Sequence, residues 1–107
     1  MLPRSLALFL LMALPAGAQT IYSLSPEDCG RVANDGSLRL GDGVIHFHEA
    51  TCTRTSAKRP LGEGWNEADW LCEGEGETWQ RRLALRIGRD RVQLRDENGT
   101  TDFMACP

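Results

Sequence analysis

The sequence predicts a small all-β domain, an antiparallel β-barrel or sandwich of about six strands with a short N-terminal helix and two disulfides. Turn-forming residues recur roughly every 8–15 positions, and the segments between them alternate apolar and polar side chains. Four cysteines follow a segment typical of an export signal. A chain this short buries too little surface to be stable on its core alone, so covalent cross-links are expected.

The first 18 residues have the three parts of a cleavable secretory signal. Arg4 is the single charge, the stretch from Leu6 to Leu14 is apolar, and small residues from Ala16 to Ala18 suit a signal peptidase. The apolar stretch is about half the roughly 20 residues that a membrane helix needs. We expect residues 1–18 to be a cleaved signal peptide and residues 19–107 to be one β domain. That domain would lie in the periplasm or outside the cell, with no membrane span.

The charge of the expected mature domain excludes a nucleic-acid-binding function. It carries 11 basic and 15 acidic residues, a formal net charge of −4, because Arg4 leaves with the signal. The charges are segregated, with six arginines between positions 81 and 95 following an acidic stretch. Either neighbouring strands pair these charges across a sheet, or the acidic stretch meets a cationic partner. The acids are Glu63, Glu67, Asp69, Glu73, Glu75 and Glu77.

The N-terminal element is predicted to be a helix of one or two turns over residues 26–32. Ser25 suits the N-cap and Pro26 the first helical position, and Glu27 and Asp28 place acids in the first turn. Such a helix would carry Cys29 towards the core.

The first half of the domain is predicted to form a hairpin followed by a long loop. Residues 37–40 and 44–53 alternate as strands do, and Gly41-Asp42-Gly43 between them suits a tight turn. Residues 54–66 are rich in charge, Gly and Pro, and are expected to be an exposed loop.

The second half is predicted to supply the other four strands, at residues 68–72, 79–87, around 92–94, and 101–106. Gly74 and Gly76 indicate a bulge or a close backbone approach. Asn98-Gly99 predicts a type I′ hairpin turn. The expected core is Leu38, Leu40, Ile45, Phe47, Leu71, Trp79, Leu83, Leu85, Ile87, Val92, Leu94 and Phe103.

The four cysteines are expected to form two disulfides, for which three pairings exist. We favour Cys52–Cys72, across the strands that flank the charged loop, and Cys29–Cys106, between the N-terminal helix and the last strand. A four-cysteine zinc site would need a CxxC pair, which the chain lacks.

Two further groups of residues suggest chemistry. His46 and His48 would share one strand face and could hold copper or zinc with a third ligand from a neighbouring strand; otherwise they are a polar outer face. Glu49 shares the parity of the core residues and would turn inward, where a salt bridge to Arg81 is the expected explanation. Acid–base catalysis by Glu49 with an acid from Glu73 to Glu77 is a formal alternative.

Trp65, between Gly64 and Asn66 in the predicted loop, is the expected exposed aromatic, whereas Trp79 is expected in the core. An exposed Trp among acids is a plausible anchor for a protein partner or a glycan. The alternative is that Trp65 packs over the end of the barrel.

Two stretches resemble small exported bacterial proteins of unknown function. They are the aromatic-x-Glu-x-x-Cys strand ending at Cys52 and the Cys72-Glu-Gly-Glu-Gly segment, together with the final Cys106. In size, compartment and inferred barrel the chain is also similar to periplasmic inhibitors of c-type lysozyme, by architecture alone, so no inhibitory residue is carried across.

The sequence therefore predicts an exported binding protein without a cofactor, and not an enzyme. The expected partner is a protein with a cationic surface, such as lysozyme, or an envelope component. The expected surface is the acidic stretch with Trp65. Metal binding through His46 and His48 and a structural role in the envelope are the alternatives.

Overall fold

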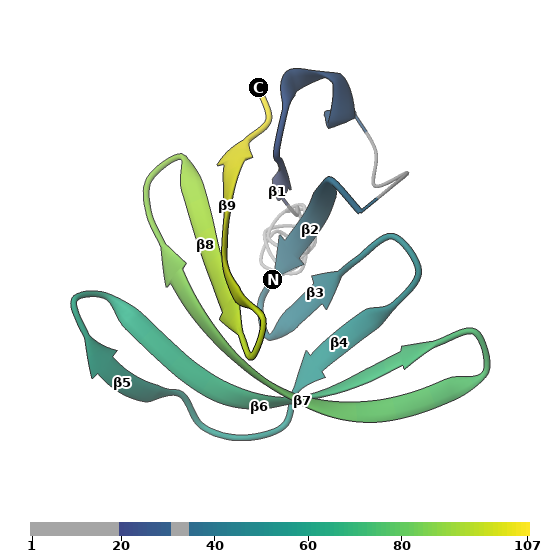
Figure 1. Cartoon of the computed structure of the whole chain (residues 1–107), viewed down its shortest axis with the longest axis vertical. Coiled ribbons are helices and arrows are strands. Elements are labelled where there is room, and N and C mark those ends of the chain that lie inside the picture. The colour runs from purple at the N-terminus through teal and green to yellow at the C-terminus, as the bar shows by residue number, and fades with distance from the viewer. Residues whose placement is uncertain (1–19, 31–34) are drawn as a thin grey trace, which may run out of the picture.

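Nine antiparallel strands form a single sheet in the computed structural model, which describes residues 20–30 and 35–107 (Figure 1). The expected signal peptide lies outside the described residues. In chain order the strands are β1 Thr20–Ser23, β2 Ser37–Gly41, β3 Val44–His46, β4 Thr51–Arg54, β5 Arg59–Gly62, β6 Trp65–Gly74, β7 Glu77–Ile87, β8 Arg91–Asp96 and β9 Gly99–Ala105. Within the described ranges, no helix is long and apolar enough to cross a membrane.

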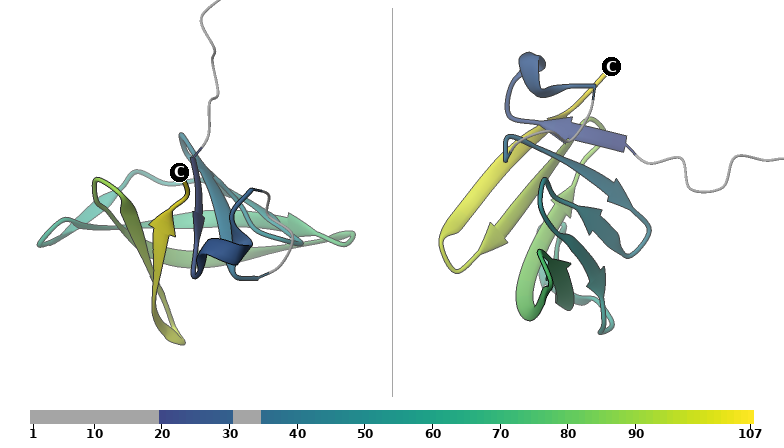
Figure 2. Two further views of the ribbon diagram at one scale, coloured as in Figure 1. Left: turned by 90° about the horizontal axis from the view of Figure 1, so that it is seen from above. Right: turned by 90° about the vertical axis from the view of Figure 1, so that its right-hand side faces the viewer.

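Eight of these strands close into a barrel. The sheet order is β4-β3-β2-β1-β9-β8-β7-β6-β5, and β4 also pairs with β6. This last pairing joins the two ends of the curved sheet, so that β5 alone lies outside the barrel on the free edge of β6. Figures 1 and 2 show the curved strands and place the C-terminus beside β1. The predicted all-β antiparallel fold is therefore confirmed, and of the two expected forms, barrel and sandwich, the structure has the barrel.

The prediction of about six strands is wrong, for three local reasons. β1 was not foreseen, although it pairs with both β2 and β9. The expected loop over residues 54–66 contains β5, which pairs with β6. The expected strand over residues 44–53 is interrupted, because Phe47 N–H donates to the Ala50 carbonyl at 2.7 Å and turns the chain between β3 and β4.

The expected N-terminal helix is also wrong. The described part of the chain has one 3-10 turn, Pro26–Asp28, and no α-helix. The Ser25 side chain makes no capping hydrogen bond to the backbone, and Cys29 is already extended, with φ −75° and ψ 160°. Gly30 follows in the left-handed region at φ 105°, which ends any helical continuation. The expected helix also included residues 31 and 32, which lie outside the described residues.

The glycine-containing turns are confirmed, with one change of type. The β8–β9 hairpin forms, but its loop residues are Glu97 and Asn98, and the only positive φ there is that of Gly99, at 133°. A type I′ turn needs positive φ at both central residues, so the predicted type is wrong. The β6–β7 hairpin was not predicted, because Gly74 and Gly76 indicated a bulge or a close backbone approach. The close approach is present at Gly74, which lies against the Glu49 carbonyl, and Glu75 and Gly76 have φ of 53° and 79°, as a type I′ turn requires.

Both predicted disulfides are present, and no described cysteine is free. Cys52 and Cys72 face each other directly in the β4–β6 ladder, where the barrel closes, and both are fully buried. Cys29–Cys106 ties the turn after β1 to the residue that follows β9. One bridge therefore fastens the closure of the barrel and the other fastens the two ends of the described chain.

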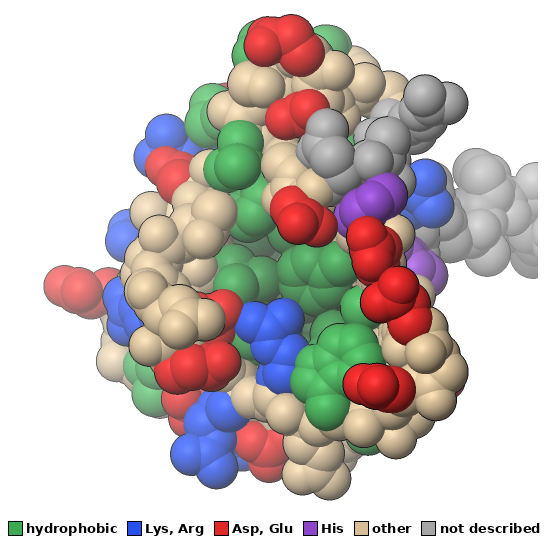
Figure 3. All heavy atoms as spheres, turned by 45° about the vertical axis from the view of Figure 1, so that its right-hand side comes forward, with side chains coloured by type: hydrophobic (Ala, Val, Ile, Leu, Met, Phe, Trp, Pro, Cys, Tyr) green, Lys and Arg blue, Asp and Glu red, His purple; other side chains and the backbone are tan. Residues whose placement is uncertain are grey.

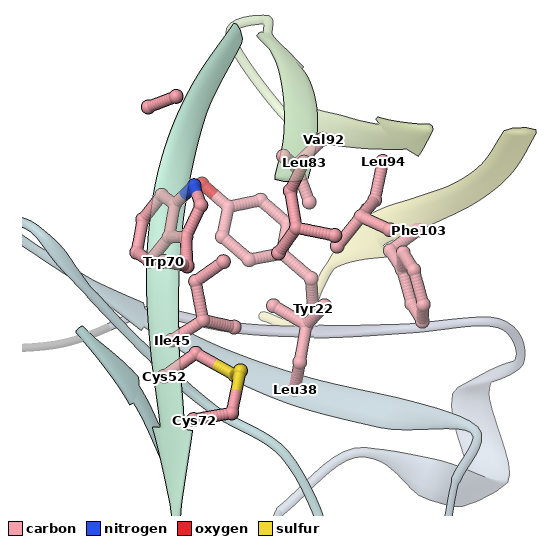
Figure 4. Close-up of a cluster of buried hydrophobic side chains, with 11 residues drawn as sticks. Tyr22, Leu38, Ile45, Cys52, Trp70, Cys72, Leu83, Val92, Leu94 and Phe103 are labelled. Carbon is pink, nitrogen blue, oxygen red and sulfur yellow. A yellow bond between two sulfur atoms is a disulfide. The ribbon is translucent and has the colours of Figure 1, made fainter. Parts of the chain in front are cut away.

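The core lies inside the barrel (Figure 4). Leu38, Ile45, Leu83, Val92, Leu94 and Phe103 are buried as predicted, and Leu40, Phe47 and Leu85 pack partly buried against them. Tyr22, Ala68, Trp70 and the Cys52–Cys72 bridge complete the core. Three predicted members differ. Trp79 and Ile87 are exposed at opposite ends of β7, and Leu71 is half-buried on the outer register of β6, between inward-facing Trp70 and Cys72.

Candidate functional site

One end of the barrel carries most of the unusual side chains, and we call it the acidic mouth. The β3–β4 turn, the β6–β7 hairpin tip, the end of β8 and the segment just before β2 meet there. In Figure 1 the β3–β4 and β6–β7 hairpins project on the same side. The acidic mouth is defined by Asp35, Phe47, His48, Glu49, Glu75, Glu77, Trp79, Arg81 and Asp96.

The surface of the acidic mouth is hollowed. Two neighbouring cavities of about 370 and 390 Å³ share Asp35, Phe47 and Arg81 as lining residues. Five carboxylates and one guanidinium line these two hollows within the described part of the chain. Figure 3 shows a hollowed face on which acidic side chains surround hydrophobic ones, with a basic side chain between them. The floor is therefore apolar and the rim is acidic.

Arg81 is held in place at the centre of the acidic mouth. Its position on β7 has the inward register of Leu83, and its guanidinium lies 2.8 Å from the Asp96 carboxylate. The same guanidinium lies 5.8 Å from the centre of the Phe47 ring, a cation–π distance. Both partners of the ion pair are mostly buried, with side-chain exposures of 25% and 16%. Because Arg81 is paired with Asp96, the positive charge of its guanidinium is balanced within that pair. The acids on the rim therefore keep their own negative charge.

Trp79 and Trp65 exchange the roles predicted for them. Trp79 has the expected inward register, but it lies where the barrel opens, and it is 38% exposed on the wall of the acidic mouth. Trp65 is 7% exposed, because the Arg95 guanidinium stacks 3.9 Å from its ring on the outer face of the sheet. The prediction that Trp65 is the exposed anchor is therefore wrong, and Trp79 is the exposed indole beside the acids.

The predicted acidic surface, residues 63–77, is divided by the fold. β6 runs from Trp65 to Gly74, so Glu63 and Glu75 lie at its opposite ends, roughly 30 Å apart at the usual rise per residue. Only the hairpin acids Glu75 and Glu77 reach the acidic mouth. Glu73 has the outer register beside the mouth, paired with Thr51 and Thr78.

Glu67 and Asp69, in the middle of β6, are neutralised on the outer face of the barrel. Arg59 of β5 lies 3.5 Å from the Glu67 carboxylate and 3.1 Å from that of Asp69. Arg82, directly opposite Asp69 on β7, lies 3.5 Å away. The hydrogen bond from Arg59 lowers the pKa of Asp69 and also raises the pKa of Arg59, and Arg82 lowers that of Asp69 further. Neighbouring strands thus pair this part of the segregated charge.

The predicted Glu49–Arg81 salt bridge is not present. Glu49 lies in the turn after β3, where strand alternation no longer holds, and its carboxylate contacts His48 Nε2 at 3.4 Å. Glu49 and Arg81 do line the same hollow, together with Glu75 and Glu77. These three carboxylates are exposed and lack the enclosed apolar surroundings of acid–base catalysts, so the geometry offers no support for the catalytic alternative.

The two histidines are separated by the end of β3. His46 is the last residue of that strand, and its Nδ1 lies 3.2 Å from Thr51 Oγ1, whereas His48 lies in the following turn. Residues 20–30 and 35–107 contain no group of three or more His, Cys, Asp or Glu side chains placed to hold a metal ion. The metal-binding alternative therefore gains no third ligand from the described residues.

The sequence analysis did not identify Asp35, Phe47, Asp96 or the exposed Trp79 as site residues, although all four belong to the acidic mouth. Asp96 has the same parity on β8 as the buried residues Val92 and Leu94. The alternation in the sequence could therefore have predicted that Asp96 faces inward. Asp35 precedes β2 and reaches the mouth through the closure of the barrel, which no local pattern indicates.

No protein-family model, curated protein or solved structure matches the chain. The similarity to exported bacterial proteins and to lysozyme inhibitors therefore stays a prediction. Functional inference rests on the geometry of the acidic mouth itself.

Proposed function

We propose that the protein is an exported, disulfide-bonded binding protein and not an enzyme. Its acidic mouth would receive a basic side chain of a protein partner, as an inhibitor of a cationic hydrolase such as lysozyme would. One observation carries the proposal. An exposed indole lies among carboxylates at the hollowed end of the barrel, and Arg81, the guanidinium lining the hollow, is already paired with Asp96.

The chemistry of the acidic mouth suits an arginine or lysine side chain. Glu49, Glu75 and Glu77 offer charge-assisted acceptors along one side of the hollow. The Trp79 ring on the same wall offers a surface for a cation–π contact. A buried Trp–Arg contact is a frequent centre of binding energy in protein interfaces. The concentration of negative charge would also accelerate encounter with a cationic partner.

The two disulfides support the proposed location. Bridges of this kind persist in oxidising compartments and are rare in the cytosol. The Cys52–Cys72 bridge also lies next to the site, because Cys52 lines one of the two hollows of the acidic mouth. An oxidised, closed barrel is thus the form in which the acidic mouth is assembled.

The proposal is tested by titrating a c-type lysozyme with the oxidised protein, following both the heat of binding and the loss of lysozyme activity. We expect saturable 1:1 binding that weakens by at least about tenfold between 50 and 300 mM salt, because screening shortens the range of the rim charges. Glu49→Gln with Glu75→Gln and Glu77→Gln should weaken binding by about 10- to 100-fold. Trp79→Ala should weaken it at every salt concentration, since it removes the ring and no charge.

The matched control removes three exposed acids that lie outside the acidic mouth, by Glu27→Gln, Glu63→Gln and Asp90→Asn. Its net charge equals that of the first triple variant, so binding within about twofold of the unmodified protein is expected. Equal losses in the two triple variants would show that only net charge matters. That result, or no binding to any of several lysozymes at low salt, would refute the proposed function.

A further inference from the structure

The opposite end of the barrel contains a third cavity, which we call the Trp70 pocket. It has a volume of about 310 Å³, within the range of small-molecule sites. The β2–β3 turn, the residues after β4, the start of β6 and the end of β7 surround it. Its lining is slightly more apolar than polar, and Asn66 is one of the polar side chains. The apolar lining side chains are Leu40, Ala68, Trp70, Leu83, Leu85 and Ile87.

The Trp70 ring lines the pocket, although its indole N–H does not open into it. Trp70 is 3% exposed, and this N–H is the one buried side-chain polar group of the described residues that has no hydrogen-bond partner. Figure 4 shows the phenol of Tyr22 directed towards the indole nitrogen, but no hydrogen bond joins them. The nitrogen is covered by surrounding atoms, so a molecule in the pocket would contact the ring and not the N–H.

The rim of the Trp70 pocket has a positive charge excess. Arg54 and Lys58 lie there with a single acid, Asp42. Arg54 is directly opposite Trp70 in the β4–β6 ladder, so both side chains leave the sheet on the same face. Among the described residues, no carboxylate lies within ion-pair distance of Arg54 or Lys58. The two ends of the barrel therefore differ in sign, with acids at one mouth and cations at the other.

We propose that the Trp70 pocket binds a small amphiphilic carboxylate, a molecule with a short hydrocarbon body and one carboxyl group. The hydrocarbon would fill the space between the apolar walls. Arg54 would pair with the carboxylate and so select an anion, and the Trp70 ring would form part of the wall around the hydrocarbon. This inference is independent of the proposed function of the acidic mouth, because the two sites share no residue.

Octanoate is a suitable probe, with octanol and octylammonium as neutral and cationic molecules of the same length. The oxidised protein labelled with ¹⁵N reports its indole N–H groups individually, and Trp70→Phe assigns the relevant signal. We expect octanoate to shift the Trp70 indole signal and to bind at least about tenfold more tightly than octanol. Octylammonium should bind more weakly than either.

Two variants separate the parts of the proposal. Arg54→Gln should remove the preference for octanoate over octanol while leaving octanol binding within about twofold. Trp70→Phe should leave the preference for octanoate over octanol within about twofold, because Arg54 and not the covered indole N–H meets the carboxylate. Trp79→Phe, at the acidic mouth, is the control and should leave octanoate binding unchanged.

The proposal is overturned if octanoate leaves the Trp70 signal unmoved, since the Trp70 ring lines the pocket. It is also overturned if octanol and octanoate bind equally to the unmodified protein, since the pocket would then recognise only an apolar body. The octanoate titration of the unmodified protein decides both points, so the test does not depend on either variant folding.

Discussion

The Cys52–Cys72 bridge lies at the one place where the sheet must join itself, and removing it tests how the barrel is held closed. Replacement of both cysteines by alanine leaves the Cys29–Cys106 bridge intact. The cysteines are directly opposed in the β4–β6 ladder, and both side chains are fully buried in the core. The substitution therefore removes a cross-link and two packed sulfur atoms together.

The size of the effect follows from the sequence separation and the burial. A separation of 20 residues corresponds to roughly 3 kcal/mol on the loop-closure model. Removing two buried sulfur atoms adds roughly 1–2 kcal/mol, at or below the low end of the range for large-to-small core substitutions. We expect a total loss of about 4–5 kcal/mol, a large part of the 5–15 kcal/mol that is typical of a domain.

Urea unfolding followed by tryptophan fluorescence gives the loss in the free energy of unfolding, and hydrogen exchange locates it. We expect the fastest exchange in β3, β4 and the C-terminal half of β6. The matched variant, Cys29→Ala with Cys106→Ala, spans 77 residues and should lose about 4.5 kcal/mol on the same model. Its exchange should rise instead in β1 and β9. A loss below about 1 kcal/mol for the first variant, or identical exchange patterns in the two, would refute the assigned role of the bridge.

Two further predictions concern a close backbone contact and an ion pair on the outer face. Gly74→Ala should destabilise the fold by about 1–3 kcal/mol, measured by urea unfolding, because a Cβ at this position would overlap the Glu49 carbonyl oxygen and displace the β3–β4 turn; an unchanged stability would show that the contact is loose. The carboxyl of Asp69 should titrate below its ordinary pKa of 3.8, and Arg59→Ala should raise the midpoint, as carbon chemical shifts would show. Because its pKa is lower in the folded state, Asp69 contributes stability above its unfolded pKa, and this contribution disappears as the pH falls through the folded value; a midpoint at or above 3.8 would contradict the pairing.

The strands that were predicted are those with a regular alternation and a clear turn at each end. β7 and β8 alternate over their inward positions, and glycine-containing turns flank β2 and β9. β5 was missed because Pro60 and Gly62 are poor strand formers, and its pairing with β6 is what orders it. The break between β3 and β4 has neither Gly nor Pro, so the turn at Phe47 carries no local signal.

The candidate site was predicted in kind but not in place. Acids beside an exposed indole were expected, yet the indole is Trp79 and only part of the acidic stretch contributes. Alternation indicates which face of the sheet a residue lies on. It does not indicate whether other strands cover that face at the residue's position along the barrel. The exposure of Trp79 and the burial of Trp65 depend on neighbours from other strands, among them Arg95.

The sequence by itself determined the all-β class, the turns at Gly41–Gly43 and Asn98-Gly99 and most of the core, because each depends on local alternation or turn residues. The count of cysteines predicted two disulfides but left three pairings open, and the structure contains the favoured one. Only the tertiary structure decided that the sheet closes through β4 and β6. That closure brings Asp35, Glu49, Glu77 and Asp96 to one mouth and leaves Arg54 and Lys58 at the other. The physical reason is that the pairing of strands distant in the sequence sets which side chains meet, and no local pattern encodes that pairing.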